Sequence, residues 1–220
     1  MIIPDICIPT NKKRSEIDDL IKDIKANTPE FNRIIASCQP LSASKNRNYC
    51  LSFANSDIIV MMDDDITGFY PGWLTNFIHP MLEDPLIIIC SARLLDKNRK
   101  RINNMGMIGG SGELQEIPAS FNHKGTGYKR VTTACIAIRK NHIRFDEEYI
   151  KSGYEDTDFM NQISRAFPAS KFIVNNNCEL IHLNHMQGQD DREAWQHNHD
   201  HYCKKWEFDT VAKDQKCWAK

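Results

Sequence analysis

Three consecutive carboxylates, Asp63, Asp64 and Asp65, follow an apolar run of five residues at 58–62. Such a run is typical of a strand that is buried on both faces of a sheet. Ligands of open α/β sheets bind beyond the carboxyl ends of the strands, which is where these aspartates stand. Because side chains alternate along an extended chain, we expect Asp63 and Asp65 to point together and Asp64 to point the other way.

Two carboxylates that project together repel each other unless a cation lies between them. Oxygen ligands of this kind suit Mg²⁺ or Mn²⁺, so one hypothesis is a metal site at Asp63 and Asp65. The alternative is an acidic turn ahead of the helix expected near Pro71, because aspartate is also common in turns and helix caps. The triplet alone does not decide between the two.

A second acidic cluster lies at 153–158, where Glu155, Asp156 and Asp158 follow a glycine and open an expected helix. Acidic residues favour the first turn of a helix through capping and the helix dipole, so the cluster has a purely structural interpretation. A carboxylate in this place can equally act as a general base if it faces a substrate hydroxyl.

The elements that hold these clusters alternate between strand and helix over the first 95 residues. This alternation predicts an α/β domain with a mostly parallel central sheet flanked by helices. The strands are expected at 5–10, 33–38, 58–62 and 86–93, and the helices at 15–26, 44–54 and 71–83.

The second half of the chain has a different character. Residues 97–130 are rich in glycine, asparagine and basic residues, which predicts a long, mobile insertion that is partly a β-hairpin. Beyond it we expect strands at 131–138 and 172–174 and helices at 156–167 and 190–206.

Composition narrows the class of protein. The chain has 220 residues, enough for one substantial domain, and its 28 basic and 29 acidic residues give no sign of nucleic-acid binding. No window has the roughly 18 to 20 apolar residues of a membrane span, and the N-terminus does not have the pattern of a signal peptide. The eight cysteines are scattered without a CxxC pair, which favours free thiols in a reducing compartment. We therefore expect a cytoplasmic protein.

The two clusters, in this order, resemble the motifs of family 2-like glycosyltransferases with the GT-A fold, which use nucleotide-diphosphate sugars. The resemblance runs from Asp5 to about His185. The similar segments are Asn46-Arg47-Asn48 with Ala54-Asn55-Ser56-Asp57 (ARN…A.GD), Met62-Asp63-Asp64-Asp65 (DxD), Pro71-Gly72-Trp73-Leu74 (PGWL), Gly153-Tyr154-Glu155-Asp156-Thr157-Asp158 (GxEDxD) and Ile181-His182-Leu183-Asn184-His185 (VxHxxH).

This resemblance implies a single GT-A domain over 1–220. Residues 1–95 would form the nucleotide-sugar-binding half, 96–190 the acceptor-binding half, and 191–220 a C-terminal helix and tail. The compact, unanchored form also resembles glycosyltransferase domains encoded by large DNA viruses, which would place it in the host cytoplasm. Tryptophans at 206 and 218 either pack back on the domain or belong to a chain that continues into further C-terminal domains.

On the donor side, the resemblance implies that Asp65 is the principal metal carboxylate. Asp63 would contact the metal, through water, or the ribose of the donor, and His182 would be the third ligand, with His185 as the alternative. Imidazole is compatible with Mn²⁺, so the cofactor is expected to be Mn²⁺ or Mg²⁺.

The remaining donor contacts come from two earlier segments and from the triplet. Pro9 and Thr10 should border the nucleotide through their main chain, and Asp64 should support the donor loop. Arg47 is a candidate for the diphosphate or the base, because its guanidinium matches phosphate oxygens; an exposed helix arginine is the alternative. UDP is the nucleotide that the family favours, although the acid that usually ends its second strand has no counterpart in Ser37-Cys38-Gln39.

On the acceptor side, the resemblance makes Asp156 the catalytic base. It would take the proton of an acceptor hydroxyl on a glycan or glycoprotein, and the anomeric centre would invert. Glu155 and Tyr154 would bind the acceptor.

Two other functions compete with this one. A sugar-nucleotide nucleotidyltransferase would need a glycine-rich phosphate loop after the first strand, and Pro9 to Arg14 has basic residues but no glycine. A catalytically inactive sugar- or nucleotide-binding module would have no reason to keep all four of Asp63, Asp65, Asp156 and His182.

Overall fold

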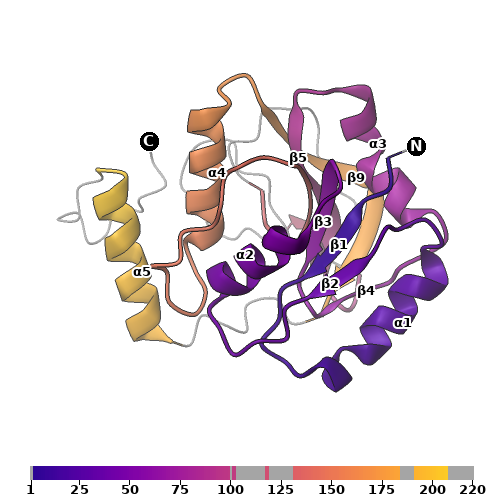
Figure 1. The fold of residues 1–220 in the computed structure, drawn as a ribbon, viewed down its shortest axis with the longest axis horizontal. Helices are drawn as coiled ribbons and strands as arrows, with labels where there is room; N and C mark the ends of the chain where they lie inside the picture. The colour runs from indigo at the N-terminus through magenta and orange to yellow at the C-terminus, as the bar shows by residue number, and fades with distance from the viewer. Residues whose placement is uncertain (1, 100, 103–116, 119–130, 184–190, 208–220) are drawn as a thin grey trace.

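The computed structural model describes residues 2–99, 101–102, 117–118, 131–183 and 191–207. A central sheet lies between two layers of helices (Figure 1). The strands are β1 (Asp5–Ile8), β2 (Ile34–Ala36), β3 (Ile58–Met62), β4 (Ile66–Thr67), β5 (Ile87–Leu95), β6 (Arg101–Ile102), β7 (Ile117–Pro118), β8 (Cys135–Arg139) and β9 (Lys171–His182). The helices are α1 (Asp18–Asn27), α2 (Ala43–Phe53), α3 (Trp73–Glu83), α4 (Glu155–Ala166) and α5 (Arg192–Lys205), with a 3-10 turn at Arg14–Glu16.

The sheet is mixed, in the order β2-β1-β3-β8-β5-β6-β7. β1 is parallel to β2 and β3, and β5 is parallel to β9, as expected from the strand–helix alternation. β8 lies between β3 and β5 and is antiparallel to both, and the pairs β4–β9, β5–β6 and β6–β7 are antiparallel as well. The expectation of a mostly parallel sheet is therefore wrong, and the sheet is mixed.

Strand β9 is much longer than the predicted strand at 172–174. Its polar run Asn175 to Asn177 hid the apolar pattern, and the register against β5 shifts there. Asn175 compensates for its burial because Nδ2 donates to the main-chain oxygens of Asn76 and Phe77 in α3, at 2.8 and 3.2 Å. The extension carries β9 on to His182, where it pairs with β4.

Strand β3 shows how the core holds the acidic triplet in place. All five of its residues are buried. Ile58, Val60 and Met62 pack with the residues of α1 and α3, whereas Ile59 and Met61 pack with those of α2 and α4. The sheet is therefore covered by apolar side chains on both faces, as the apolar run at 58–62 predicted.

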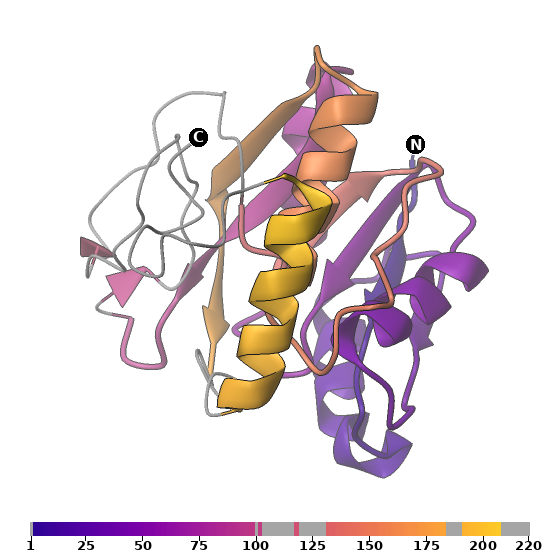
Figure 2. The same ribbon diagram turned by 90° about the vertical axis from the view of Figure 1, so that its left-hand side faces the viewer.

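Helix α5 lies beside α4 rather than on the sheet (Figures 1 and 2). A separate buried cluster of Tyr149, Tyr154, Tyr202 and Cys203 joins the two helices. Trp206 packs back on the domain, since its Nε1 donates to Oδ1 of Asp158 at 2.8 Å, whereas Trp218 lies outside the described residues.

Three further predictions meet the structure here. β6 and β7 form a short antiparallel pair within the expected insertion, whose other residues from 103 to 130 lie outside the description. The seven cysteines of the described segments are free. In those segments no helix has the length and apolar character needed to cross a membrane.

Candidate active site

The acidic triplet sits where β3 gives way to a tight turn. The main-chain N–H of Asp63 donates to the carbonyl of Ala134 at 2.8 Å, next to β8. The turn at Asp64 and Asp65 leads straight into β4, whose first residue, Ile66, stands opposite His182 of β9. The N–H of Leu183 donates to the carbonyl of Asp65 at 3.1 Å. Strand pairing therefore fixes the aspartates and His182 against one another.

Ligand atoms of Asp63, Asp65 and His182 all lie within 4.8 Å of one another. In the part of the chain that the structure describes, this is the one group of three or more such ligands. Oδ1 of Asp65 lies 3.2 Å from Nε2 of His182 without hydrogen-bond geometry. Two carboxylates and an imidazole form a donor set that fits Mn²⁺ or Mg²⁺. His185, the alternative ligand, lies outside the described residues.

The electrostatics of the cluster favour a bound cation. Burial raises the pKa of Asp63 to about 6, against the opposing effect of Arg47 and His182. Burial lowers the pKa of His182, but the carboxylates of Asp65 and Asp63 outweigh it and raise that pKa overall. His182 and Asp63 therefore hold a proton more readily than free side chains do, whereas, against the effect of burial, His182 keeps the pKa of Asp65 lowered; a divalent ion can take the place of such protons.

Arg47 joins the two acidic clusters. Its side chain is 8% exposed, with NH1 2.6 Å from Oε1 of Glu155 and NH2 3.6 Å from Oδ1 of Asp63. The guanidinium carbon lies 5.2 Å from the centre of the Phe145 ring. The alternative of an exposed helix arginine is therefore wrong. Burial lowers the pKa of Arg47, and Glu155 and Asp63 more than restore it, so the side chain stays charged.

The loop after β1 is tied to the triplet through Asp64. Oδ1 of Asp64 lies 2.6 Å from Nζ of Lys12, and Oδ2 accepts a hydrogen bond from the hydroxyl of Thr10. The main chain of Thr10 pairs with Ser37, whose Oγ accepts from its N–H at 2.8 Å and donates to its carbonyl at 2.9 Å. The expected main-chain contact of Thr10 with a nucleotide therefore gains no support, while Pro9 is half-buried at the end of β1. Lys12 and Ser37 carried no motif that would have singled them out.

In the second acidic cluster, Asp156 is partly exposed whereas Glu155 is buried. Asp156, in the first turn of α4, is partly exposed, and its Oδ1 accepts from the N–H of Thr157 at 2.6 Å. Burial and the charge of Glu155 raise the pKa of Asp156, and Arg47 opposes them. Glu155 is buried, with one oxygen bound by Arg47 and the other by the N–H of Gly153. Both oxygens of Glu155 therefore have a partner within the chain, and its predicted role in acceptor binding stays a prediction.

Tyr154 packs against aromatic side chains of α5. It is 5% exposed, and its ring centre lies 5.4 to 5.6 Å from those of Trp195, His199 and Tyr202 in α5. A side chain packed in this way is a contact between α4 and α5, so a direct role in acceptor binding gains no support.

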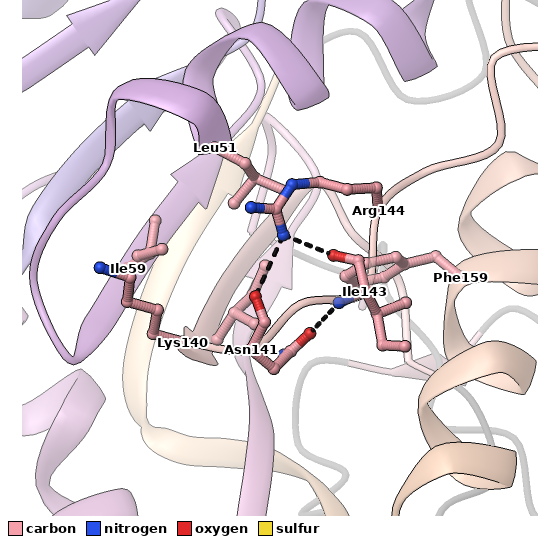
Figure 3. Close-up of a pocket in the computed structure, with 8 residues that line it drawn as sticks. Leu51, Ile59, Lys140, Asn141, Ile143, Arg144 and Phe159 are labelled. Carbon is pink, nitrogen blue, oxygen red and sulfur yellow. Dashed lines mark hydrogen bonds between the residues drawn. The ribbon is translucent and has the colours of Figure 1, made fainter.

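A shallow pocket lies at the other end of β3 and has a different character (Figure 3). Its Lys140 donates from its N–H to the carbonyl of Asp57, at the amino end of β3. The guanidinium of Arg144 is occupied by the carbonyls of Asn141 and Ile143, at 3.0 and 2.9 Å. No carboxylate, cysteine or histidine lines it, so this pocket does not have the donor set of the acidic clusters. Its lining residues are Leu51, Ile59, Ile138, Lys140, Asn141, Ile143, Arg144 and Phe159.

Comparison with known proteins identifies the family of this chain. The model of the family described as "Glycosyl transferase family 2" matches residues 5–147. No curated protein matches the chain.

Solved structures share the fold at low sequence identity. GalNAc-T7 with UDP, GalNAc and Mn²⁺ is 10% identical with a TM-score of 0.60, over 93% of this chain and 48% of that one. Glucosyl-3-phosphoglycerate synthase from Mycobacterium tuberculosis, with Mn²⁺, UDP-glucose and phosphoglyceric acid, is 9% identical with a TM-score of 0.60, over 96% and 82%. The mannosyltransferase PcManGT from Pyrobaculum calidifontis, with GDP-Man and Mn²⁺, is 12% identical with a TM-score of 0.56, over 98% and 65%. These likenesses confirm the predicted GT-A fold, and the chain spans about half the length of the GalNAc-T7 structure.

Proposed function

We propose a metal-dependent, inverting sugar transfer for this chain, which belongs to glycosyl transferase family 2. A glycosyltransferase of this family moves a sugar from a nucleotide sugar. In the proposed reaction the donor is a UDP-sugar and the acceptor is a hydroxyl of a glycan or glycoprotein. The observation that supports this most is the meeting of Asp63, Asp65 and His182 at the carboxyl end of β3, joined through Arg47 to the start of α4.

Asp63, Asp65 and His182 would hold Mn²⁺ or Mg²⁺. When bound, such an ion neutralises the charge that builds on the diphosphate oxygens as the leaving group departs. The imidazole ligand favours Mn²⁺ over Mg²⁺. Structures of GalNAc-T7 and of the mycobacterial synthase contain Mn²⁺ together with UDP or UDP-glucose, which supports this choice.

Asp156 acts as the general base. Its raised pKa keeps the carboxylate basic enough to accept the proton of the acceptor hydroxyl. The oxygen of that hydroxyl forms a bond to the anomeric carbon on the face opposite the diphosphate. The bond from carbon to the diphosphate oxygen breaks, and its electron pair leaves with the nucleotide, so the configuration inverts.

Arg47 and Glu155 position the reacting groups. The charge of Arg47 offsets that of Asp63 and holds this carboxylate toward the metal site, while Glu155 anchors the other side of the guanidinium. The pairing of Arg47 with Glu155 supports this positioning role, and binding of the diphosphate by Arg47 and of the acceptor by Glu155 stay predictions. In this proposal residues 1–95 form the donor half and residues 96–190 the acceptor half. His182 is the exception, because it belongs to the later half but would bind the metal of the donor site.

The donor site is tested by calorimetric titration of UDP, GDP and CDP into the protein with Mn²⁺, and again with EDTA. We expect UDP to bind most tightly, and its binding to disappear with EDTA and in Asp65→Ala. Asp84→Ala, which changes a surface aspartate paired with Lys171, is the control and should bind as the unchanged protein does. Binding of UDP that survives EDTA would refute the metal site and favour a binding module. Formation of a sugar nucleotide from a nucleoside triphosphate and a sugar phosphate would instead favour the nucleotidyltransferase.

A further inference from the structure

We propose that Asn198 of α5 is a positioning residue for the reaction: it holds the segment 150–153 and thereby fixes Glu155 and Asp156 at the start of α4. This inference rests on the proposed role of Asp156 as the base. Helix α5 lies outside the residues 5–147 that the family model matches, so the family does not supply this role.

The side chain of Asn198 is fully buried and bonds only to the main chain of this segment. Its Nδ2 donates to the carbonyls of Ile150, Ser152 and Gly153, at 2.8, 3.2 and 3.0 Å. Its Oδ1 accepts from the N–H of Ile150 at 2.9 Å. One amide thus takes the place of the regular hydrogen bonds that a loop lacks.

The segment that Asn198 holds has an unfavourable backbone. Lys151, Gly153 and Tyr154 have φ values of 52°, 110° and 67°, in the left-handed region that non-glycine residues avoid. Such conformations persist only where surrounding contacts fix them. Directly after them comes Glu155, which accepts from the N–H of Gly153 and binds Arg47. A shift of the segment would therefore move both Glu155 and the neighbouring Asp156.

Helix α5 is itself fixed at both ends, so Asn198 is a rigid support. At the first end, Asp191 caps the helix by accepting from the N–H of Ala194 at 3.0 Å, and it also pairs with Lys151. At the other end, Lys205 and Trp206 contact the buried Asp158, at 3.0 and 2.8 Å. Figure 1 shows α5 beside α4. The helix therefore contacts Lys151 before Asp156 and Asp158 after it.

This arrangement predicts a defect in turnover without a defect in donor binding. Asn198 does not contact Asp63, Asp65 or His182, and misplacement of a catalytic group by about 1 Å can cost about 10² in rate. A residue that served only stability would lower the melting temperature without changing turnover of the folded protein.

The test uses Asn198→Asp, which keeps the size of the side chain but turns a carboxylate oxygen toward three carbonyls. Asn198→Ser is the milder variant in case the first does not fold. The control is Gln196→Ala, an exposed position of the same helix whose side chain bonds to Asp200. The readout is nucleotide release, with water as acceptor, from the sugar nucleotide that the unchanged protein hydrolyses fastest among UDP- and GDP-sugars.

We expect turnover at saturating donor to fall about 10- to 100-fold in Asn198→Asp, while the Kd of UDP with Mn²⁺ changes by less than about threefold. Amide exchange in the peptide 148–158 should become faster in Asn198→Ser, with no change in the peptide 58–67. The control should match the unchanged protein in all three measurements.

Combination with Asp156→Asn separates positioning from a general structural effect. If Asn198 acts through Asp156, Asn198→Asp should cost little further turnover in the Asp156→Asn background. The inference would be overturned if the fold losses in turnover of the two single variants multiplied in the double variant. It would also be overturned if Asn198→Asp lowered UDP affinity as much as it lowers turnover. Normal turnover in Asn198→Asp together with loss in Asp156→Asn would overturn this inference alone. Normal turnover in Asp156→Asn would overturn the proposed base and this inference with it.

Discussion

The two acidic clusters of this chain are held in place by different means. The first cluster, Asp63 and Asp65 with His182, is called the donor edge here because it is the proposed donor site. Its residues stand at the ends of paired strands, and main-chain hydrogen bonds fix their spacing. The second cluster, at the start of α4, is called the acceptor edge because it holds the proposed base, Asp156. Asp156 follows a loop that contains left-handed residues, and side chains of α5 hold this loop in place. The strand-built edge suits a metal site, which needs fixed ligands, and the loop-built edge depends on contacts outside the sheet.

This difference makes the two edges separable by mutation. Changes at the strand ends should abolish donor binding, whereas changes at the start of α4 should reduce turnover and leave donor binding intact. Arg47 is the exception, because it contacts both clusters.

The largest change is expected from Asp65→Ala or from removal of the metal with EDTA. A metal ion that neutralises a diphosphate contributes several kcal/mol to the transition state, so turnover should fall by about 10³-fold or more. UDP affinity should fall with it. Nucleotide release and calorimetry on the same samples check this, and Asp65→Ala with normal turnover would remove the donor edge from the mechanism.

Asp156→Asn should lower kcat by about 10²- to 10⁴-fold, the usual contribution of a positioned base. The Kd of UDP should not change. Since the base acts in its deprotonated form and the pKa of Asp156 is raised, turnover should fall as the pH drops through that pKa. This acidic limb should be lost in Asp156→Asn. Steady-state kinetics over a range of pH measure this limb. Loss of donor affinity with kcat intact would contradict the assignment, because it would place Asp156 in donor binding instead of turnover.

Arg47→Met tests the connection between the edges through stability. It leaves Glu155 and Asp63 without their buried partner, which should cost about 3–5 kcal/mol in the free energy of unfolding. Adding Glu155→Gln should recover part of this loss, because the double variant no longer buries an uncompensated carboxylate. Urea unfolding of the single and double variants measures the difference. A loss of less than about 1 kcal/mol in Arg47→Met would show that the pair is not a structural connection.

The smallest change is expected in the free energy of unfolding when Asp146, which pairs with His201 and Lys205 of α5, is replaced. Burial raises the pKa of this carboxyl, but Lys205 and His201 of α5 outweigh it and bring the pKa to about 2. A lowered folded-state pKa stabilises the protein above the unfolded value, and this contribution is lost as the pH falls from about 4 toward 2. Asp146→Asn should therefore reduce the free energy of unfolding by up to about 2 kcal/mol at pH 7 and little at pH 2. Unfolding at both pH values, with the exposed Asp200→Asn as the control, checks this; an equal loss at both would assign the effect to packing.

The donor edge was the more predictable from sequence, for a physical reason. The alternation of β3 and the position of the triplet at a strand end determine where Asp63 and Asp65 point, and both are visible in a few consecutive residues. The strand that carries His182 was harder to predict, because Asn175 to Asn177 interrupt its apolar pattern. Of these three, Asn175 is buried, and it bonds to main-chain oxygens of α3.

The acceptor edge depends on contacts between distant residues, and those have no local signal. Nothing near Arg47 indicates that it pairs with Glu155, so its burial could not be distinguished from exposure. Tyr154 is next to the proposed catalytic residues Glu155 and Asp156 in sequence, but its ring packs on α5. Asn198 lies in a polar helix, and no sequence motif marks it.

The most direct test of the metal-dependent donor site is a crystal of this protein grown with Mn²⁺ and UDP, examined by anomalous diffraction at the manganese edge. We predict an anomalous peak bonded to carboxylate oxygens of Asp63 and Asp65 and to Nε2 of His182, with the diphosphate on its open side. Bound UDP with no manganese at these three residues would contradict the account and leave the acidic triplet as a structural turn.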